Sequence, residues 1–282
     1  MPVPEKLRAA VEALAGVPHL LVALDFDGTL APFVPRPEDA RPLPGSAAAL
    51  RALAAGADDG PAAATGGGEG SSSTPGPGSA APERRTTTAL LSGRHLSSLR
   101  ATASPPAGTW LVGSHGAERY SPAAGEEPLT LTEAQAAELD RTTDALRRVA
   151  ERFPGARLEH KPSGVVLHVR QCSDEDGAAA LEAGRTALAD RDVKATEGKA
   201  VLEAAVVRVD KGIGLAWLRD GTGADATVFV GDDVTDEHGF AVLAEGDLGV
   251  KVGDGATAAG YRLETLDDVT EFLELLRAVR HL

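Results

Sequence analysis

The stretch LLVALDFDGTLAPF, residues Leu20–Phe33, joins an apolar run to two aspartates that flank a phenylalanine. Side chains two positions apart in an extended chain face the same side, so Asp25 and Asp27 can converge while Phe26 turns into the packing. Gly28 then allows a sharp turn of the backbone. Two adjacent carboxylates are costly without a cation, and a hard divalent metal such as Mg²⁺ is the simplest resolution. Taken alone, the pattern also fits an ordinary turn at the end of a strand.

Three further apolar runs end, like Leu20–Leu24, in small and polar residues. They are Ala89–Leu91 before Ser92, Gly93 and Arg94; Trp110–Val112 before Gly113, Ser114 and His115; and Val228–Val230 before Gly231, Asp232 and Asp233. Uninterrupted apolar runs are typical of strands in a parallel sheet that helices cover on both faces. Helices are predicted at 46–54, 211–219 and 269–277, the last with Asp268 as its N-cap. The pattern predicts an α/β fold with a doubly wound, mainly parallel sheet whose strand ends form a ligand crevice.

The pattern changes between Val112 and Val228. A long helix at about 133–152 precedes extended segments at 157–160 and 164–170, a helix at about 175–191, and strands near 193–196 and 199–204. This is enough for a small α/β module inserted at residues 119–205, which leaves 1–118 and 206–282 to form the core. Residues 56–82 are rich in Gly, Ser, Ala and Pro, so they are predicted to form a disordered loop within the core.

The composition of the 282 residues excludes several classes of function. The formal net charge is -14 and no Lys/Arg-rich run occurs, so neither nucleic acid nor an anionic membrane is an expected partner. No apolar run approaches the roughly 18 residues of a membrane span, and the first residues lack the layout of a signal peptide. The single cysteine, Cys172, cannot form an internal disulfide. We expect a soluble protein of the reducing cytoplasm.

A second acidic cluster changes the interpretation of Asp25 and Asp27. The segment GDDVTDE, 231–237, follows another apolar strand, and its four acids exceed what one helix cap uses. Positive charge comes from Lys211 in VDKGIG, and SGR at 92–94 offers a hydroxyl beside backbone N–H groups. A hydroxyl and an ammonium form a minimal cradle for a phosphoryl group whose charge rises during transfer.

In this order, DFDGT, Ser92, Lys211 and GDDVTD resemble the four motifs of the haloacid dehalogenase-type phosphatase superfamily. The resemblance implies that Asp25 attacks phosphorus to give an aspartyl phosphate. It implies that Asp27 protonates the leaving alcohol and then activates water, while Lys211 and Ser92 steady the phosphoryl group. It also implies Mg²⁺ as the cofactor. The implied metal ligands are Asp25, the carbonyl of Asp27 and Asp232, with Asp236 close behind and Asp233 as a direct or outer contributor.

Longer blocks are similar to the trehalose-6-phosphate phosphatase family. They are GSHGAE at 113–118, LEHKPSGVVLHVR at 158–170, GKAVLEAAVVRVDKG at 198–212 and GDDVTDE at 231–237. Extended segments place acids and bases of the module on one face, where they can meet several sugar hydroxyls. The resemblance implies that Glu159, Lys161 and Glu203 bind the glucose ring distal to the phosphate. It puts His115 and Glu118 near the same opening, and Gly93 and Arg94 complete the predicted substrate-binding set.

The expected function is Mg²⁺-dependent hydrolysis of trehalose 6-phosphate in trehalose biosynthesis, with the inserted module closing over the core. Two alternatives stay open: the same chemistry on another sugar phosphate, and a non-catalytic domain that senses the sugar phosphate. The acid and base pairs of the module also fit surface ion pairs of little consequence. The resemblance leaves open whether a trehalose-6-phosphate synthase associates with the chain.

Overall fold

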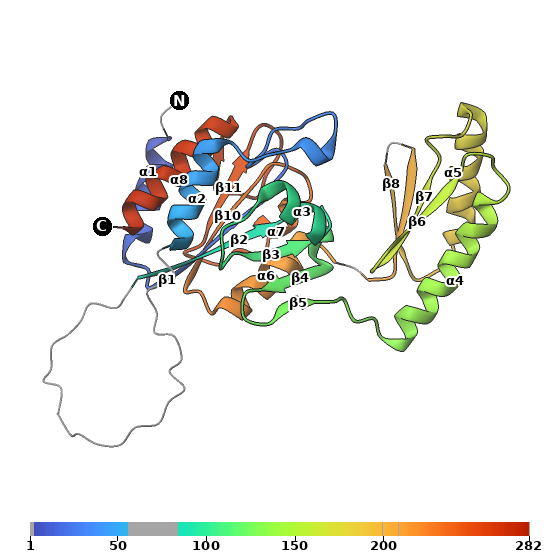
Figure 1. Cartoon of the computed structure of the whole chain (residues 1–282), viewed down its shortest axis with the longest axis horizontal. Coiled ribbons are helices and arrows are strands. Elements are labelled where there is room, and N and C mark those ends of the chain that lie inside the picture. The colour runs from blue at the N-terminus through green and yellow to red at the C-terminus, as the bar shows by residue number, and fades with distance from the viewer. Residues whose placement is uncertain (1–2, 56–83, 199, 208, 282) are drawn as a thin grey trace, which may run out of the picture. The chain divides into compact units, whose positions relative to one another are not determined.

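A computed structural model of the chain describes residues 3–55, 84–198, 200–207 and 209–281. They form two compact units, whose helices and strands are labelled in Figure 1. The larger unit is made from Met1–Glu127 and Asp210–Leu282, and the smaller from Pro128–Val209. The insertion thus begins at residue 128 rather than 119 and ends at 209 rather than 205. The predicted loop at 56–82 lies outside the described residues.

The larger unit is built on an eight-stranded sheet in the order β12-β11-β10-β1-β2-β3-β4-β5. Its strands are β1 (His19–Leu24), β2 (Arg85–Leu91), β3 (Trp110–Gly113), β4 (Glu118–Ser121), β5 (Gly125–Glu127), β10 (Ala226–Gly231), β11 (Leu248–Val252) and β12 (Tyr261–Leu263). Neighbours from β12 to β3 run parallel, whereas β4 and β5 continue the edge in antiparallel pairing. Because β4 and β5 pair with this sheet, the larger unit extends beyond the predicted limit of residue 118.

Helices cover both faces of the sheet. Along β1, Leu20, Val22 and Leu24 belong to one hydrophobic cluster and Leu21 and Ala23 to another, because successive side chains point to opposite faces. The first cluster contains residues of α1 (Glu5–Ala13), α2 (Pro44–Ala55), α3 (Leu96–Ala103) and α8 (Leu266–Arg280), and the second contains residues of α6 (Lys211–Thr222) and α7 (Glu237–Phe240). Figure 1 shows α1, α2 and α8 side by side. The predicted α/β fold with a doubly wound, mainly parallel sheet is confirmed.

Capping interactions fix where two helices of the larger unit begin. At α6, the Asp210 side chain accepts a hydrogen bond from the Ile213 N–H at 3.0 Å, which starts the helix at Lys211. At α8, Thr265 Oγ1 accepts from the Asp268 N–H and the Asp268 carboxylate accepts from the Thr265 N–H. The prediction of Asp268 as the N-cap is wrong, because Asp268 is the third helical residue and the second member of a capping box.

The smaller unit has a four-stranded antiparallel sheet in the order β6-β7-β9-β8. Its elements are α4 (Glu133–Ala150), β6 (Arg157–Lys161), β7 (Gly164–His168), α5 (Asp174–Leu188), β8 (Lys194–Gly198) and β9 (Val201–Ala205). One face of the sheet packs against the two helices through a cluster that includes Val165, Leu167 and Leu202. Val166 and its register partner Glu203 alternate with these residues, so they lie on the opposite face.

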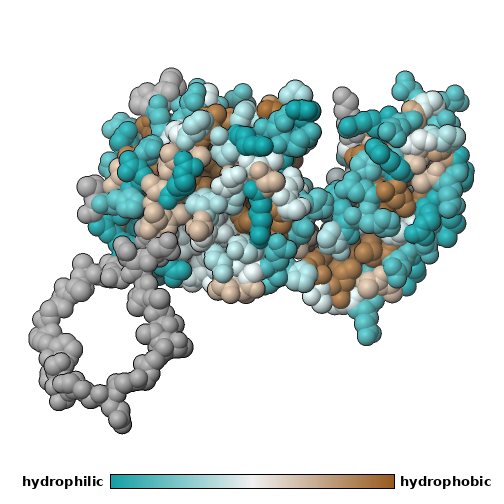
Figure 2. Space-filling view, viewed as in Figure 1, coloured by the Kyte–Doolittle hydropathy of each residue, from teal (hydrophilic) through white to brown (hydrophobic). Residues whose placement is uncertain are grey.

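The visible surface of the chain is largely polar. Figure 2 shows mostly hydrophilic side chains on the face that it draws. Within the described ranges, none of the helices combines the length and the apolarity that crossing a membrane requires.

Candidate active site

The strand order creates a crevice at the carboxyl ends of β1 and β10. From β1 the chain moves outward through β2 and β3, and from β10 it moves outward the other way through β11 and β12. Such a reversal is a topological switch point, where ligands bind in open α/β sheets. Asp25 directly follows β1 and Asp232 directly follows β10, so the two acidic segments of the sequence meet there.

A buried lysine bridges two of the acids. Lys211 is 2% exposed, and its Nζ lies 2.9 Å from Asp25 Oδ1 and 2.7 Å from Asp236 Oδ1. Burial raises the pKa of Asp25 well above its usual range, with Asp236 adding to the shift and Lys211 opposing it. Burial also opposes the charged form of Lys211, but the two carboxylates outweigh it and raise the pKa of the ammonium. Lys211 is therefore a charged group at neutral pH.

Asp236 organises the acidic loop that follows β10. Its Oδ2 accepts the N–H of Asp232 at 3.1 Å and the N–H of Asp233 at 2.9 Å, while its Oδ1 accepts from Lys211. A Cβ on Gly231 would lie 2.3 Å from Asp236 Cγ, so the close approach requires glycine. Because the protein engages both oxygens, the geometry assigns Asp236 to holding the loop.

Asp25, Asp232 and Asp236 form a cluster that suits a divalent cation. Carboxylate oxygens of the three residues all lie within 4.8 Å of one another. Gly28, at φ +80°, makes room for this cluster, since a Cβ there would lie 2.1 Å from Asp232 Oδ2. Burial, followed by the charge of Asp236, raises the pKa of Asp232. The carboxylate oxygens of Asp25 and Asp232, with Asp236 close behind them, fit the predicted Mg²⁺.

Asp27 is held in a different environment from Asp25. Arg94 Nε donates to Asp27 Oδ2 at 2.5 Å, and Arg94 Nη2 donates to Asp27 Oδ1 at 2.6 Å. The hydrogen bond to Asp27 is the main cause that raises the pKa of Arg94. The guanidinium also lies over the Phe26 ring, with Cζ 5.2 Å from the ring centroid. Asp27 remains 28% exposed while Asp25 is buried, so the two carboxylates are suited to separate tasks.

The candidate catalytic residues line one cavity of about 240 Å³. Pockets that enclose a whole drug-sized ligand begin at roughly 300 Å³, so this cavity suits a phosphoryl group and the atoms next to it. Asp25, Asp27, Ser92 and Lys211 line it together with Gly93, Arg94, His115 and Asp233. Phe33 and Thr235 line it as well, and the sequence did not predict them as site residues. Phe33 is 75% exposed, which the structure alone shows, and its place directly after DFDGTLAP is the sequence signal that could have identified it.

Ser92 and His115 reach the cavity from the ends of neighbouring strands. Ser92 follows β2, and its Oγ accepts the Arg94 N–H at 3.2 Å. His115 lies after β3 at φ +57°, in the left-handed region that is uncommon for residues other than glycine. Gly93 faces the imidazole, because a Cβ on residue 93 would lie 2.5 Å from His115 Cε1. This close packing fixes the ring of His115 beside the SGR segment.

Glu118 supports the turn that carries His115. Its Oε2 accepts from Ser114 Oγ at 2.7 Å and from the Leu96 N–H at 3.1 Å, and it lies 3.3 Å from His95 Nδ1. Glu118 is not among the residues that line the cavity. The sequence predicted a direct substrate contact for Glu118, whereas these hydrogen bonds favour a positioning role.

The remaining predicted residues lie on one sheet of the smaller unit. Lys161 Nζ donates to Glu203 Oε1 at 3.0 Å, and Glu159 Oε2 lies 2.8 Å from His168 Nε2. Glu159 and Glu203 flank Val166 in the strand register, so both acids share the face away from the helices. The sequence did not predict His168. Its spacing of two residues from Val166 is the signal that could have identified it.

Proteins of similar sequence share one description. A family model described as trehalose-phosphatase matches residues 81–264. The chain is 32% identical over 286 aligned residues to the trehalose-phosphate phosphatase of Mycobacterium avium, across 96% of this chain and 65% of that protein. It is 31% identical over 266 residues to the trehalose-phosphate phosphatase of Mycobacterium tuberculosis, across 90% of this chain and 60% of that protein.

A solved structure shares the fold. Aspergillus fumigatus trehalose-6-phosphate phosphatase matches with a TM-score of 0.67 and 24% identity over 99% of both chains. The chain spans 65% and 60% of the length of the two curated mycobacterial relatives.

Proposed function

The chain belongs to the trehalose-phosphatase family, and from this membership we propose that it hydrolyses trehalose 6-phosphate to trehalose and phosphate. The resemblance noted in the sequence blocks is thereby confirmed at the level of the family. The names of the mycobacterial relatives support the substrate. The observation that carries the chemistry is the cavity in which a buried Asp25, bridged by Lys211, adjoins a more exposed Asp27.

In the proposed first step, Asp25 is the nucleophile. An Asp25 carboxylate oxygen bonds to phosphorus, the bond between phosphorus and the sugar oxygen breaks, and Asp27 donates a proton to that sugar oxygen. The products are an aspartyl phosphate and free trehalose. The contact of 2.9 Å between Lys211 Nζ and Asp25 Oδ1 supports this role, because it fixes the carboxylate at the cavity wall.

In the proposed second step, water hydrolyses the aspartyl phosphate. Asp27 removes a proton from water, the water oxygen bonds to phosphorus, and the bond between phosphorus and Asp25 breaks. Phosphate leaves, and Asp27 again carries the proton needed for the next cycle. The 28% exposure of the Asp27 side chain supports this role, because the group that activates water has to be reached by water.

Ser92, Arg94 and Lys211 are proposed to bind the phosphoryl group. All three line the same cavity as Asp25, and together they offer a hydroxyl, a guanidinium and an ammonium. Such donors stabilise the charge that develops on the phosphoryl oxygens during transfer. Arg94 is also proposed to turn from Asp27 to the phosphoryl group when the substrate binds. This movement would release Asp27 for proton transfer.

Asp25 and Asp232 are proposed to hold Mg²⁺, with the carbonyl of Asp27 implied by the family resemblance as a further ligand. When bound, Mg²⁺ neutralises charge on the carboxylates and on the phosphoryl oxygens. Asp236 supports Asp232 from behind through the backbone N–H groups it accepts. Asp233 lines the cavity, so it is proposed to contribute through the outer shell.

Glu159, Lys161 and Glu203 are proposed to recognise the sugar hydroxyls. Lys161 and Glu203 are hydrogen-bonded at 3.0 Å, which offers a donor and an acceptor at one point of the sheet. His115 and the Glu118 that supports its turn are proposed to act on the phosphate side of the substrate. A donor and acceptor pair such as Lys161 and Glu203 can bind neighbouring hydroxyls, because each hydroxyl both accepts and donates a hydrogen bond.

A panel of phosphate esters tests the proposed function. Phosphate release is measured with trehalose 6-phosphate, glucose 6-phosphate and sucrose 6-phosphate, each with Mg²⁺ and with a chelator. We expect kcat/KM for trehalose 6-phosphate to exceed the others by roughly tenfold or more, the size that a few unpaired hydroxyl contacts provide. Equal or better turnover of another ester would favour the alternative of a different sugar phosphatase. No turnover of any ester would favour a sugar-phosphate-sensing domain.

A further inference from the structure

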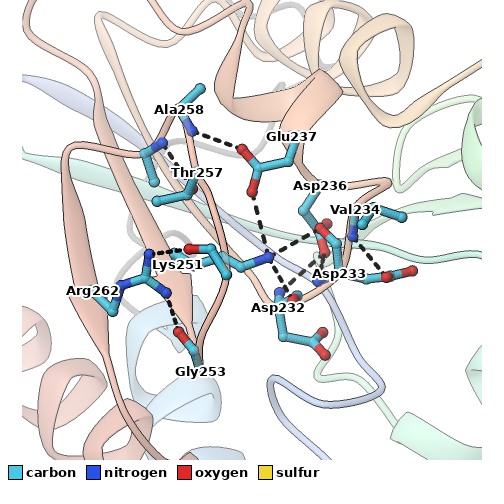
Figure 3. Close-up of polar contacts among 12 residues, drawn as sticks. Asp232, Asp233, Val234, Asp236, Glu237, Lys251, Gly253, Thr257, Ala258 and Arg262 are labelled. Atoms are coloured by element: carbon cyan, nitrogen blue, oxygen red, sulfur yellow. Dashed lines mark hydrogen bonds and ion pairs between the residues drawn. The ribbon is translucent and has the colours of Figure 1, made fainter.

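A second buried lysine lies beneath the acidic loop and outside the cavity lining. Lys251 is 3% exposed and occupies β11, whose other residues are Leu248, Gly249, Val250 and Val252. Its Nζ donates to the carbonyl of Asp232 at 2.6 Å and to the carbonyl of Asp233 at 3.3 Å (Figure 3). A buried ammonium in an apolar strand is costly unless its hydrogen bonds are used.

The contacts of Lys251 and Asp236 together hold the backbone of Asp232. The Asp232 N–H donates to Asp236 Oδ2 at 3.1 Å, and the Asp232 carbonyl accepts from Lys251. The backbone of Asp232 is therefore fixed on both sides by charged groups, which form stronger hydrogen bonds than neutral ones. A backbone fixed in this way sets the direction of the Asp232 side chain, which lies in the same cluster as Asp25.

Lys251 is itself anchored by Glu237. Glu237 Oε1 lies 3.4 Å from Lys251 Nζ, and Glu237 Oε2 accepts the Ala258 N–H at 2.7 Å, as Figure 3 shows. Two charged side chains therefore hold the acidic loop: Asp236 accepts hydrogen bonds from its N–H groups, and Lys251 donates hydrogen bonds to its carbonyls. Between them, Asp233 and Val234 are exposed, so the loop has little apolar packing of its own to hold it.

We propose that Lys251 is a positioning residue, which orders the loop 232–237 and so presents Asp232 to the divalent cation. The inference rests on the proposed function, in which Asp232 is a ligand of Mg²⁺. Groups that orient metal ligands through hydrogen bonds change metal affinity by roughly 10- to 100-fold when they are removed.

The direction in which Mg²⁺ affinity changes on removal of the Lys251 charge distinguishes a positioning role from a purely electrostatic one. A fixed cation near a cation site repels the metal, so removing the charge of Lys251 on electrostatic grounds alone would tighten Mg²⁺ binding. Loss of loop order acts in the opposite direction, because binding then has to fix the backbone of Asp232 as well. A weaker Mg²⁺ affinity after removal of the ammonium is therefore the signature of positioning.

The test compares Lys251→Met with the matched control Arg280→Met in the full chain. Arg280 is another buried cation of the larger unit, 6% exposed, and it donates to the carbonyls of Leu14 and Val17 at 3.0 and 2.6 Å. Mg²⁺ binding is measured by calorimetry without substrate, and kcat and KM are measured at saturating Mg²⁺. We expect Lys251→Met to raise the Kd for Mg²⁺ by roughly tenfold or more, and Arg280→Met to leave it unchanged.

An unchanged or lower Kd for Mg²⁺ in Lys251→Met would overturn the proposal. If this variant does not fold, Lys251→Gln decides by the same criterion, since its amide is neutral and its side chain is one atom too short to reach both carbonyls as Nζ does. Failure of the proposed function has a different outcome, because a wild-type chain that binds no Mg²⁺ contradicts the metal site itself. Wild-type binding that Lys251→Met and Lys251→Gln both preserve contradicts only the role of Lys251.

Discussion

Arg94 and Asp27 form a two-bond ion pair at the cavity, with the Nε–Oδ2 distance at 2.5 Å and the Nη2–Oδ1 distance at 2.6 Å. Both carboxylate oxygens of Asp27 accept hydrogen bonds in this pair. The proposed first step requires a proton on Asp27, so the pair has to open when a phosphoryl group enters. The arginine therefore connects phosphate binding to the readiness of the acid.

The first prediction concerns Arg94→Lys. Lysine keeps the positive charge but offers a point charge in place of a planar fork, so it cannot engage two oxygens side by side. We expect KM for trehalose 6-phosphate to rise roughly tenfold with a smaller change in kcat, the pattern for loss of binding shared by substrate and transition state. Steady-state kinetics measure both constants. A KM equal to that of the wild type would contradict a role for Arg94 in phosphate binding.

The second prediction concerns Asp25→Asn. The amide has nearly the shape of the carboxylate and is neutral, so it avoids the cost of burying a charge that raises the pKa of Asp25, and we expect the fold to be retained. It is no nucleophile, so kcat should fall by at least about 10³-fold. Circular dichroism and phosphate release are the measurements, and Asp220→Asn on the exposed side of α6 is the matched control. Near-wild-type turnover in Asp25→Asn would refute the covalent route.

The convergence of Asp25 and Asp232 could be predicted from the sequence. Both residues follow apolar runs, and the carboxyl ends of parallel strands share one edge of a sheet. The role of Lys251 could not be predicted, because it depends on β11 lying beside β10, and strand order is not encoded in any local pattern. The Arg94–Asp27 pair depends on side-chain directions, which the spacing of 67 residues does not constrain.

The limits of the inserted module could not be predicted either, because they depend on which strands pair with the core sheet. β4 and β5 have the sequences ERYS and GEE, which are too short and polar to show an alternating pattern, so their pairing with the core sheet was missed. The start of α8 was recoverable, since Thr265 and Asp268 have the spacing of a capping box. Edge strands held by backbone pairing leave a weaker trace in a sequence than buried strands do.

The third prediction concerns metal removal. A chelator should abolish turnover, and Mg²⁺ at about 100 times its Kd should stabilise the folded chain by roughly 2.7 kcal/mol, or about 5 to 10 °C in Tm. In Asp232→Asn, which lacks one proposed ligand, the rise in Tm at the same Mg²⁺ concentration should be much smaller. Differential scanning calorimetry measures both. An equal rise in the two proteins would place the metal elsewhere.

The fourth prediction concerns sugar recognition. Glu203→Gln weakens the pair with Lys161, whose Nζ lies 3.0 Å from Glu203 Oε1, and removes a charged acceptor. We expect kcat/KM for trehalose 6-phosphate to fall roughly 10- to 100-fold, with less than about twofold change for p-nitrophenyl phosphate, which has no sugar hydroxyls. Glu182→Gln on α5 is the matched control. Equal losses on both esters would contradict a role in specificity.

The last prediction concerns the dependence of stability on pH. Burial, with Arg85 adding to it, lowers the pKa of His19 below its ordinary value of 6.5. The folded chain thus binds this proton less readily than the unfolded chain, so His19 contributes stability that is present above pH 6.5 and is lost as pH falls through the folded pKa. In His19→Gln the amide can still hydrogen-bond Thr87, whose Oγ1 lies 2.9 Å from His19 Nε2, but it does not titrate.

We therefore expect the Tm of the wild type to fall relative to that of His19→Gln between about pH 7.5 and about pH 5.5. The other histidines titrate in both proteins, so they cancel in the difference. A Tm difference that is the same at both pH values would mean that the folded chain and the unfolded chain bind the proton of His19 equally well.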